Sequence, residues 1–112
     1  MDGGWVGVLT ADLHLPDARS LKAKRKELLR LKQRLAARLG CSVAEVDHHD
    51  LWQRAAISLA VVGRTAADVE EMLAEADRRL HADEAFEALD VAREAWPIEI
   101  EPSFTTAERG GA

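Results

Sequence analysis

Apolar and polar residues alternate in the first part of the chain and then recur at helical spacing. The stretch 5–15 alternates, with leucine and alanine on one side, and this predicts a strand with one buried face. Pro16 stops the strand. Leucines at helical spacing from Leu21 to Leu39 then predict an amphipathic helix. Ser20 is a suitable N-cap for this helix, and Gly40 supplies its C-terminal stop.

The second half of the chain repeats this order. Residues 41–48 alternate and predict a second strand, and the apolar run 55–62 predicts a buried third strand. Thr65 then caps a helix, with Asp68 imitating a capping box. The apolar stripe of that helix consists of Val69, Leu73, Ala76 and Leu80. A last strand is predicted within 85–95. Pro97 limits this strand to the edge of the sheet or marks its end, and Ile98 and Ile100 would extend that edge.

The order strand, helix, strand, strand, helix, strand predicts an α+β fold, a ferredoxin-like βαββαβ sandwich. Its antiparallel sheet has the strand order 4-1-3-2, with two helices on one face. The first two strands then run in the same direction. We therefore expect His14, the start of the first helix and the connection Asp47–Arg54 to meet at one end of the sheet. Residues 1–102 are expected to form this single domain, and residues 103–112 a disordered tail.

Charge distinguishes the first helix from the rest of the protein. The segment 19–38 has nine Lys or Arg and one acidic residue, whereas the other residues include six basic and nineteen acidic ones. Segregated cations usually mark a surface that meets an anionic partner, because clustered like charges repel one another. The acidic pI of about 5.3 argues against general coating of nucleic acid. Nucleic-acid binding would therefore come from this helix.

The start of the basic helix is the first candidate site. Its first two turns carry four cations where the helix dipole is positive, and each exposed cation is unfavourable there by about 0.3–1 kcal/mol. A docked phosphate or carboxylate would offset this cost. Alternatively, the cations form a solvated face that pairs with the acidic body of the protein. On a helical wheel Lys24 flanks the leucine stripe and raises its charged end to solvent, whereas Arg30 faces outward.

The connection Asp47–Arg54 is the second candidate site. In one interpretation, Trp52 and Arg54 form a stacking and phosphate-binding platform beside the basic helix. In the other, Leu51 and Trp52 anchor the connection to the core, and an aspartate caps a turn. The candidate anion-binding or RNA-binding residues are Ser20, Lys22, Lys24, Arg25, Lys26, Arg30, Trp52 and Arg54.

Histidines and aspartates in this region raise metal binding and catalysis as alternatives. His48 and His49 are adjacent and point to opposite sides of an extended chain, so we expect no metal and no cofactor. A candidate polar site consists of His14, Asp47, His48 and Gln53, of which the first three could serve a small enzyme as acid–base groups. The chain lacks the G-x-S-x-G, H-E-x-x-H and paired C-x-x-C motifs. We therefore expect a binding protein rather than an enzyme.

A cytoplasmic setting is expected from three further features. The single cysteine, Cys41, cannot form an intrachain disulfide. No signal-peptide pattern follows Met1. The apolar runs are far shorter than the ~20 residues that a membrane span requires, and no membrane partner is expected.

Three stretches resemble the YlxP-like family of small bacterial proteins: DLHLP at 12–16, SLKAKR at 20–25 and SVAEVDHHDLWQRA at 42–55. The resemblance covers about residues 5–95 and implies a ferredoxin-like fold. The family is a domain of unknown function, so the resemblance implies no catalytic residues. Members are often encoded among translation genes, near those for initiation and ribosome-binding factors, which implies a ribosomal or RNA role by association. His49 stands where other members often have Gln.

Two kinds of binding function follow. The leading hypothesis is a protein that docks structured RNA or a ribosomal surface, with phosphate contacts supplying most of the affinity. The second is a ligand-sensing or protein-interaction module, a homodimer joined through the edges or faces of its sheet.

Overall fold

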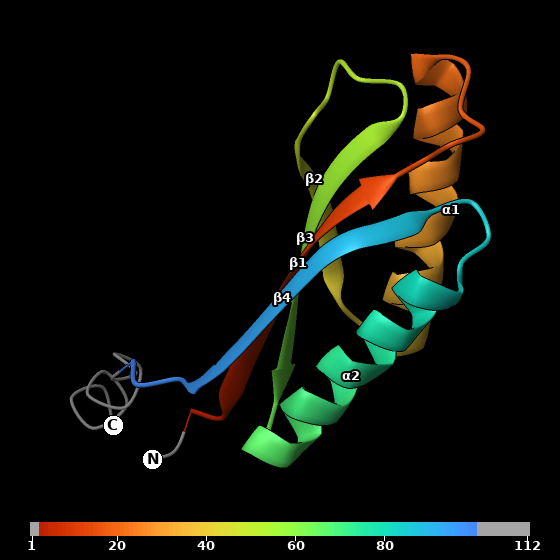
Figure 1. The fold of residues 1–112 in the computed structure, drawn as a ribbon. Helices are drawn as coiled ribbons and strands as arrows, with labels where there is room; N and C mark the ends of the chain where they lie inside the picture. The colour runs from red at the N-terminus through yellow and green to blue at the C-terminus, as the bar shows by residue number, and fades with distance from the viewer. Residues whose placement is uncertain (1–2, 101–112) are drawn as a thin grey trace.

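The computed structural model describes residues 3–100, which form β1 (Trp5–His14), α1 (Leu21–Leu39), β2 (Ser42–Asp47), β3 (Arg54–Gly63), α2 (Ala66–Ala82) and β4 (Glu87–Pro97). The strands make one antiparallel sheet in the order β2-β3-β1-β4, with both helices on one face (Figure 1). This is the order 4-1-3-2 read from the other edge. The predicted ferredoxin-like fold is therefore confirmed. The predicted tail lies outside the described residues.

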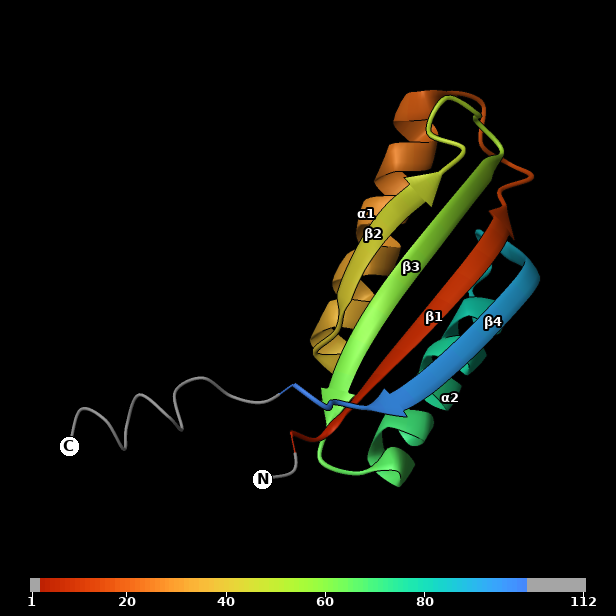
Figure 2. The same ribbon diagram turned by 90° about the vertical axis from the view of Figure 1, so that its left-hand side faces the viewer.

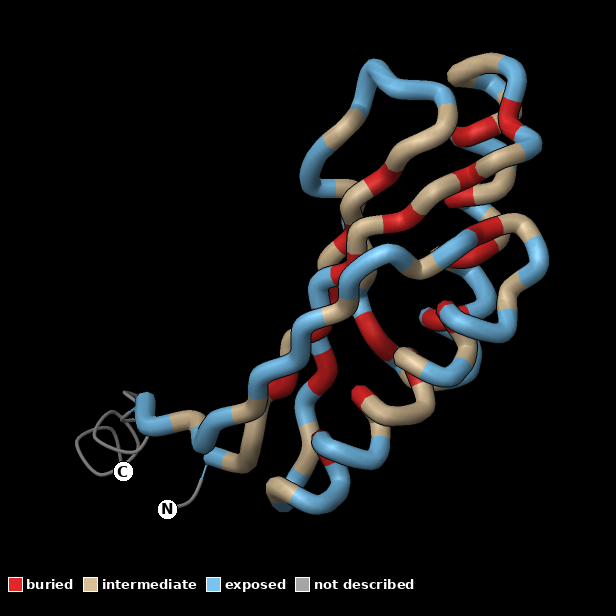
Figure 3. The backbone as a smooth tube through the Cα atoms, viewed as in Figure 1, coloured by how far each residue is buried: buried red, intermediate tan, exposed pale blue. Residues whose placement is uncertain are grey.

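The core lies between the sheet and the helices (Figure 3). In β1, Leu9, Ala11 and Leu13 are buried, while the alternating residues face away from the helices. The predicted apolar stripe of α2 is also buried, at Val69, Leu73, Ala76 and Leu80. Gly7 allows α2 to approach β1 closely, because a Cβ atom at this position would lie 2.9 Å from Leu73 Cδ1.

The predicted helix caps are confirmed. Ser20 Oγ accepts a hydrogen bond of 3.0 Å from the backbone N–H of Ala23, and Thr65 Oγ1 accepts one of 3.1 Å from Asp68. Gly40 ends α1 in the left-handed conformation, with φ of 64°. These local interactions fix where each helix starts and where α1 stops.

The last strand differs from its prediction at both ends. It begins at Glu87 and continues to Pro97, because β1 starts at Trp5 and its register pairs that residue with Pro97. Ile98 and Ile100 do not extend the strand, although the Ile98 N–H donates to the carbonyl of Gly4 over 2.8 Å. The proline therefore lies at the end of an edge strand, which agrees with both places predicted for it.

The other face of the sheet, called the open face here, points away from the helices (Figure 2). No helix or strand within residues 3–100 covers it. It carries the second set of alternating side chains from all four strands. The open face and the helix layer are therefore two separate surfaces.

Candidate functional site

Three segments that are distant in sequence meet at one end of the molecule, as the topology predicted (Figure 1). They are the end of β1, the start of α1 and the connection between β2 and β3. The backbone N–H of Leu15 donates to the carbonyl of Gln53 over 2.9 Å. The Gln53 side chain donates in turn to the carbonyls of Pro16 at 3.1 Å and Ala18 at 3.2 Å. Gln53 therefore joins the connection to the segment that leads into α1.

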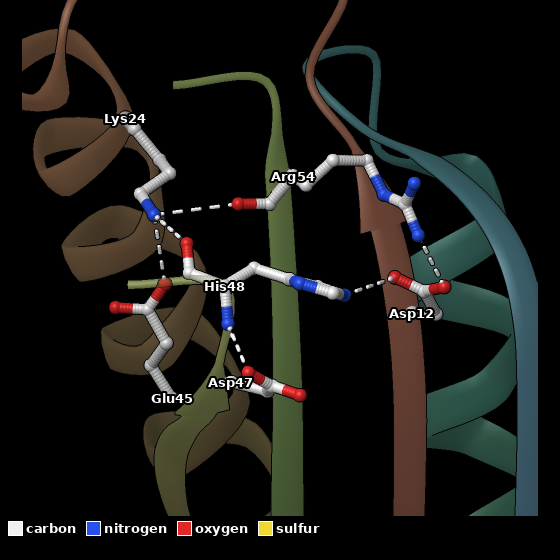
Figure 4. Close-up of polar contacts among 6 residues, drawn as sticks. All are labelled: Asp12, Lys24, Glu45, Asp47, His48 and Arg54. Carbon is white, nitrogen blue, oxygen red and sulfur yellow. Dashed lines mark hydrogen bonds and ion pairs between the residues drawn. The ribbon is translucent and has the colours of Figure 1, made fainter. Parts of the chain in front are cut away.

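Lys24 links the start of α1 to the same connection (Figure 4). Its Nζ donates to Glu45 Oε2 at 3.0 Å and to the carbonyls of His48 at 2.8 Å, His49 at 3.1 Å and Arg54 at 3.3 Å. The residue is fully buried. The prediction that Lys24 raises its charged end to solvent is wrong, because its ammonium group is enclosed by one carboxylate and three carbonyls. It positions the connection and is not available to an external anion.

The backbone of the connection turns sharply at His48. This residue has a φ of 64°, the only positive φ of a non-glycine residue among residues 3–100. A register shift between Glu45 and Asp47 precedes it. Asp47 Oδ1 accepts a hydrogen bond of 2.7 Å from the His48 N–H, which supports the turn. The turn exposes the His48 carbonyl to Lys24 and sends the imidazole toward β1 on the opposite side (Figure 4).

On that side, Asp12 joins two predicted site residues. Arg54 donates to Asp12 Oδ2 at 2.6 Å, and His48 Nε2 lies 3.5 Å from Asp12 Oδ1. The hydrogen bond from Arg54 is the main cause that lowers the pKa of Asp12, and the same bond raises the pKa of Arg54. One interpretation of the sequence assigns Arg54 to phosphate binding. The structure shows its guanidinium already paired, at the end of the open face.

The other histidine of the predicted polar site has a different partner. His14 Nδ1 lies 3.3 Å from Glu87 Oε2, at the start of β4. His14 is the register partner of Arg54 on β3. The candidate acid–base residues thus occur as His14 with Glu87, His48 with Asp12, and Asp47 with a backbone N–H.

The cations of α1 divide into two groups. Arg30 donates to both oxygens of Asp83, at 2.9 and 2.8 Å, and to Glu27. These bonds raise its pKa. Further along, Arg34 pairs with the same aspartate at 4.0 Å and Arg38 with Glu75 at 3.8 Å. The expectation of an outward, available Arg30 is therefore wrong, because Asp83 and Glu27 already hold its guanidinium. Of the later cations, Lys32 alone has no ion-pair partner in the described part of the chain.

The earlier cations of this region are unpaired. Arg19, Lys22, Arg25 and Lys26 are exposed, and none of them has an ion-pair partner within the described part of the chain. Leu51 and Trp52 in the neighbouring connection are 50% and 54% exposed. The interpretation that these two residues anchor the connection to the core is wrong, because Gln53 and Lys24 hold it instead. We call the four cations together with Leu51 and Trp52 the cation corner.

A shallow pocket of about 320 Å³ lies beside the cation corner. Leu15, Ala18, Ala23 and Ala85 supply its apolar lining, and Lys26, Asp17 and Glu27 supply its charged lining. This side of the corner is therefore mixed in charge. Arg25 and Lys22 are not among the residues that line it, and they belong to the more uniformly basic part of the corner.

Sequence reasoning missed the two carboxylates that organise this end of the molecule, Glu45 and Asp12. It also misplaced Lys24. The sequence does contain a signal for the burial of Lys24. The spacings along the series Lys24, Leu28, Leu31 and Leu35 are four, three and four residues, which is the spacing of one helix face. That spacing puts the lysine on the apolar stripe rather than beside it. No sequence pattern identified which carbonyls would meet it.

Two further features bear on the site. Among the described residues, no group of three His, Cys, Asp or Glu side chains could hold a metal ion. Neither helix in residues 3–100 has the length and apolar content needed to cross a membrane.

Comparison with known proteins places the chain among relatives without an assigned activity. Residues 6–93 match the family model described as "Protein of unknown function (DUF503)". The chain is similar to "Uncharacterized protein YlxP" of Bacillus subtilis (strain 168), with 31% identity over 68 residues, 61% of this chain and 74% of the relative. A solved structure titled "Structural Genomics, protein YJCS" aligns with a TM-score of 0.47 and 15% identity, over 80% of this chain and 96% of that chain. The first two matches confirm the resemblance found in the sequence.

Proposed function

We propose that this chain, which belongs to the DUF503 family of proteins of unknown function, is a binding protein that docks structured RNA through the cation corner. One observation carries this proposal. The exposed cations at the start of α1 have no carboxylate partners in residues 3–100, whereas Arg30, Arg34 and Arg38 on the same helix are paired. The acidic body of the protein pairs with the three later arginines of the basic helix, where Lys32 alone lacks an ion-pair partner among residues 3–100, and leaves all the exposed cations at the other end unpaired.

The unpaired cations lie where they repel one another and the helix dipole. Lys22 and Lys26 are one helical turn apart, a spacing at which like charges destabilise a helix. Both also lie near the positive end of α1. An RNA phosphate close to them would remove both unfavourable terms. It would not have to break an existing ion pair, which binding at Lys24, Arg30 or Arg54 would require.

Trp52 gives the corner a second kind of contact. Its exposed ring lies on the connection that Lys24 fixes against α1. An indole next to cations can stack on an unpaired base while the cations contact the backbone, and base–aromatic stacking contributes about 1–3 kcal/mol. Structured RNA with a loop or bulge supplies both groups.

The proposal is tested by the binding of the full chain to a fluorescently labelled stem-loop RNA and to isolated ribosomal subunits. Four cations that each neutralise one phosphate predict a log–log salt slope near −3, so the affinity should fall about 50- to 100-fold between 50 and 200 mM salt. Replacing Lys22, Arg25 and Lys26 together with Gln should abolish measurable binding. An affinity that is unchanged over this salt range would contradict the phosphate mechanism.

A matched pair of single variants separates the corner from general charge effects. Arg25 and Arg64 are both exposed and both lack an ion-pair partner among the described residues, but they lie at opposite ends of the sheet. Arg25→Gln should weaken RNA binding several-fold, whereas Arg64→Gln should leave it unchanged. Equal losses from the two substitutions would show that only net charge matters and would overturn the proposed location.

A further inference from the structure

The centre of the open face carries mostly small and uncharged side chains. One row across the four strands consists of Ala44, Ser58, Thr10 and Ala92, which the strand registers place side by side. The next row consists of Ser42, Ala60, Val8 and Glu94, so its one charge lies at the β4 edge. Apart from Glu94 these side chains are small, so a second layer could approach the sheet closely. For a protein with 31% charged residues, an uncharged patch of this kind requires an explanation.

The two hydroxyl groups in this centre already share a hydrogen bond. Thr10 Oγ1 and Ser58 Oγ form a hydrogen bond of 2.9 Å with each other. A partner that covers this face would therefore not strand these hydroxyl groups without a hydrogen bond. At one end of the face the apolar surface continues into Val62 and Trp96, which are 66% and 44% exposed, with Val6 between them.

The sheet is large enough to support a stable association. Its strands contain 10, 6, 10 and 11 residues. With a rise of about 3.3 Å per residue and about 4.8 Å between strands, one face covers about 600 Å². Two such faces in contact would bury about 1,200 Å² in total, which is at the lower limit of specific interfaces.

The charges on the open face favour a second copy of the chain over nucleic acid. Glu94 and Asp90 on β4 face the same way as Asp12, whose charge is matched by Arg54. The face is therefore net acidic, and its central rows contain no aromatic side chain for base stacking. An RNA backbone would meet these acidic groups with phosphates, whereas a second copy can place its uncharged central row opposite the same row.

We propose that the open face is the interface of a homodimer in which two sheets pack face to face. A two-fold axis parallel to the strands, between β1 and β3, places β4 of each copy over β2 of the other. By register, Glu94 of one copy then faces Ser42 of the other, which carries no charge, whereas the row of Asp90 meets the row of Asp47 at the end of the interface. Aligned sheet packing of this kind is a common way to bury two sheet faces.

The mass of the full chain in solution tests the proposal directly. Sedimentation equilibrium from low micromolar to sub-millimolar concentration should give twice the 12.3 kDa chain mass. A mass that stays at 12.3 kDa throughout this range overturns the proposal without any variant.

Paired substitutions identify the surface. Ala60→Glu places a charge in the centre of the open face, whereas Ala37→Glu makes the same change on the exposed surface of α1. Opposed like charges in an interface are strongly unfavourable, so Ala60→Glu should weaken dimerisation at least about 100-fold and Ala37→Glu should not weaken it. Circular dichroism and urea unfolding establish that both variants are folded. A folded Ala60→Glu protein that dimerises as tightly as the wild type would show that association uses a different surface.

Discussion

Lys24 is the residue that decides the geometry of the candidate site. A lysine side chain is almost never fully buried unless it is paired, and this one is enclosed by four hydrogen-bond acceptors. Glu45 balances its charge, and the carbonyls of His48, His49 and Arg54 satisfy its remaining donors. These bonds hold the connection against α1, so its backbone keeps its position although Trp52 is exposed and does not anchor it. A single buried side chain therefore positions an exposed surface.

Removal of the Lys24 ammonium group should destabilise the protein strongly. Lys24→Met keeps the buried stem but leaves Glu45 and the three carbonyls without their donor, and breaking a buried pair in this way costs about 3–5 kcal/mol. Urea unfolding monitored by circular dichroism measures this loss. Lys26→Met, which changes an exposed and unpaired lysine, should change the free energy of unfolding by less than about 0.5 kcal/mol. Equal stability of the two variants would contradict the assigned role of Lys24.

At the scale of elements, the sequence predicted most of the fold. The bounds of α1, both N-caps and the strand order follow from local periodicity and from the handedness of crossovers, so they could be derived without coordinates. The ion pairs could not. Asp83, Glu45 and Asp12 are ordinary acidic residues in the sequence, and their partners lie 53, 21 and 42 positions away. Which cations of α1 are paired and which are unpaired can therefore be read only from the three-dimensional structure.

The pair of Arg30 and Asp83 joins α1 to the end of α2 and should make stability depend on pH. Burial raises the pKa of Asp83, but the hydrogen bond from Arg30 and further favourable contacts outweigh it, so the net pKa is lowered. A carboxyl group with a lowered folded pKa stabilises the fold above its unfolded pKa, and this contribution disappears as the pH falls. We therefore expect the free energy of unfolding to decrease below about pH 4.

Asp83→Asn isolates this contribution. The substitution should cost about 2 kcal/mol at pH 7, as expected for the loss of charge-assisted hydrogen bonds to a nearly buried group. The difference from wild type should shrink between about pH 4 and pH 2, where the wild-type carboxyl group also becomes neutral. Urea unfolding at several pH values gives both curves. Parallel curves down to the lowest pH would show that Asp83 is not the titrating group.

At the scale of the whole molecule, the two proposed interaction surfaces belong to different layers. The cation corner lies at one end of the helix layer, whereas the open face is the opposite side of the sheet (Figures 1 and 2). A homodimer formed through the open face would leave both corners accessible. It would present two sets of cations and two Trp52 side chains to one RNA.

This arrangement predicts that dimerisation affects the binding of long RNA more than that of short RNA. An RNA that reaches both corners gains from the high effective concentration of the second site, whereas a short stem-loop contacts one corner only. The dimer-disrupting variant Ala60→Glu should therefore bind a short stem-loop as the wild type does and bind a tandem stem-loop at least about tenfold more weakly than the wild type. Anisotropy titrations of both probes at one salt concentration make the comparison, with Ala37→Glu as the control for added negative charge. If folded Ala60→Glu lost affinity for the short stem-loop while Ala37→Glu kept it, the sheet would itself contact RNA, and the separation of the two surfaces would be wrong.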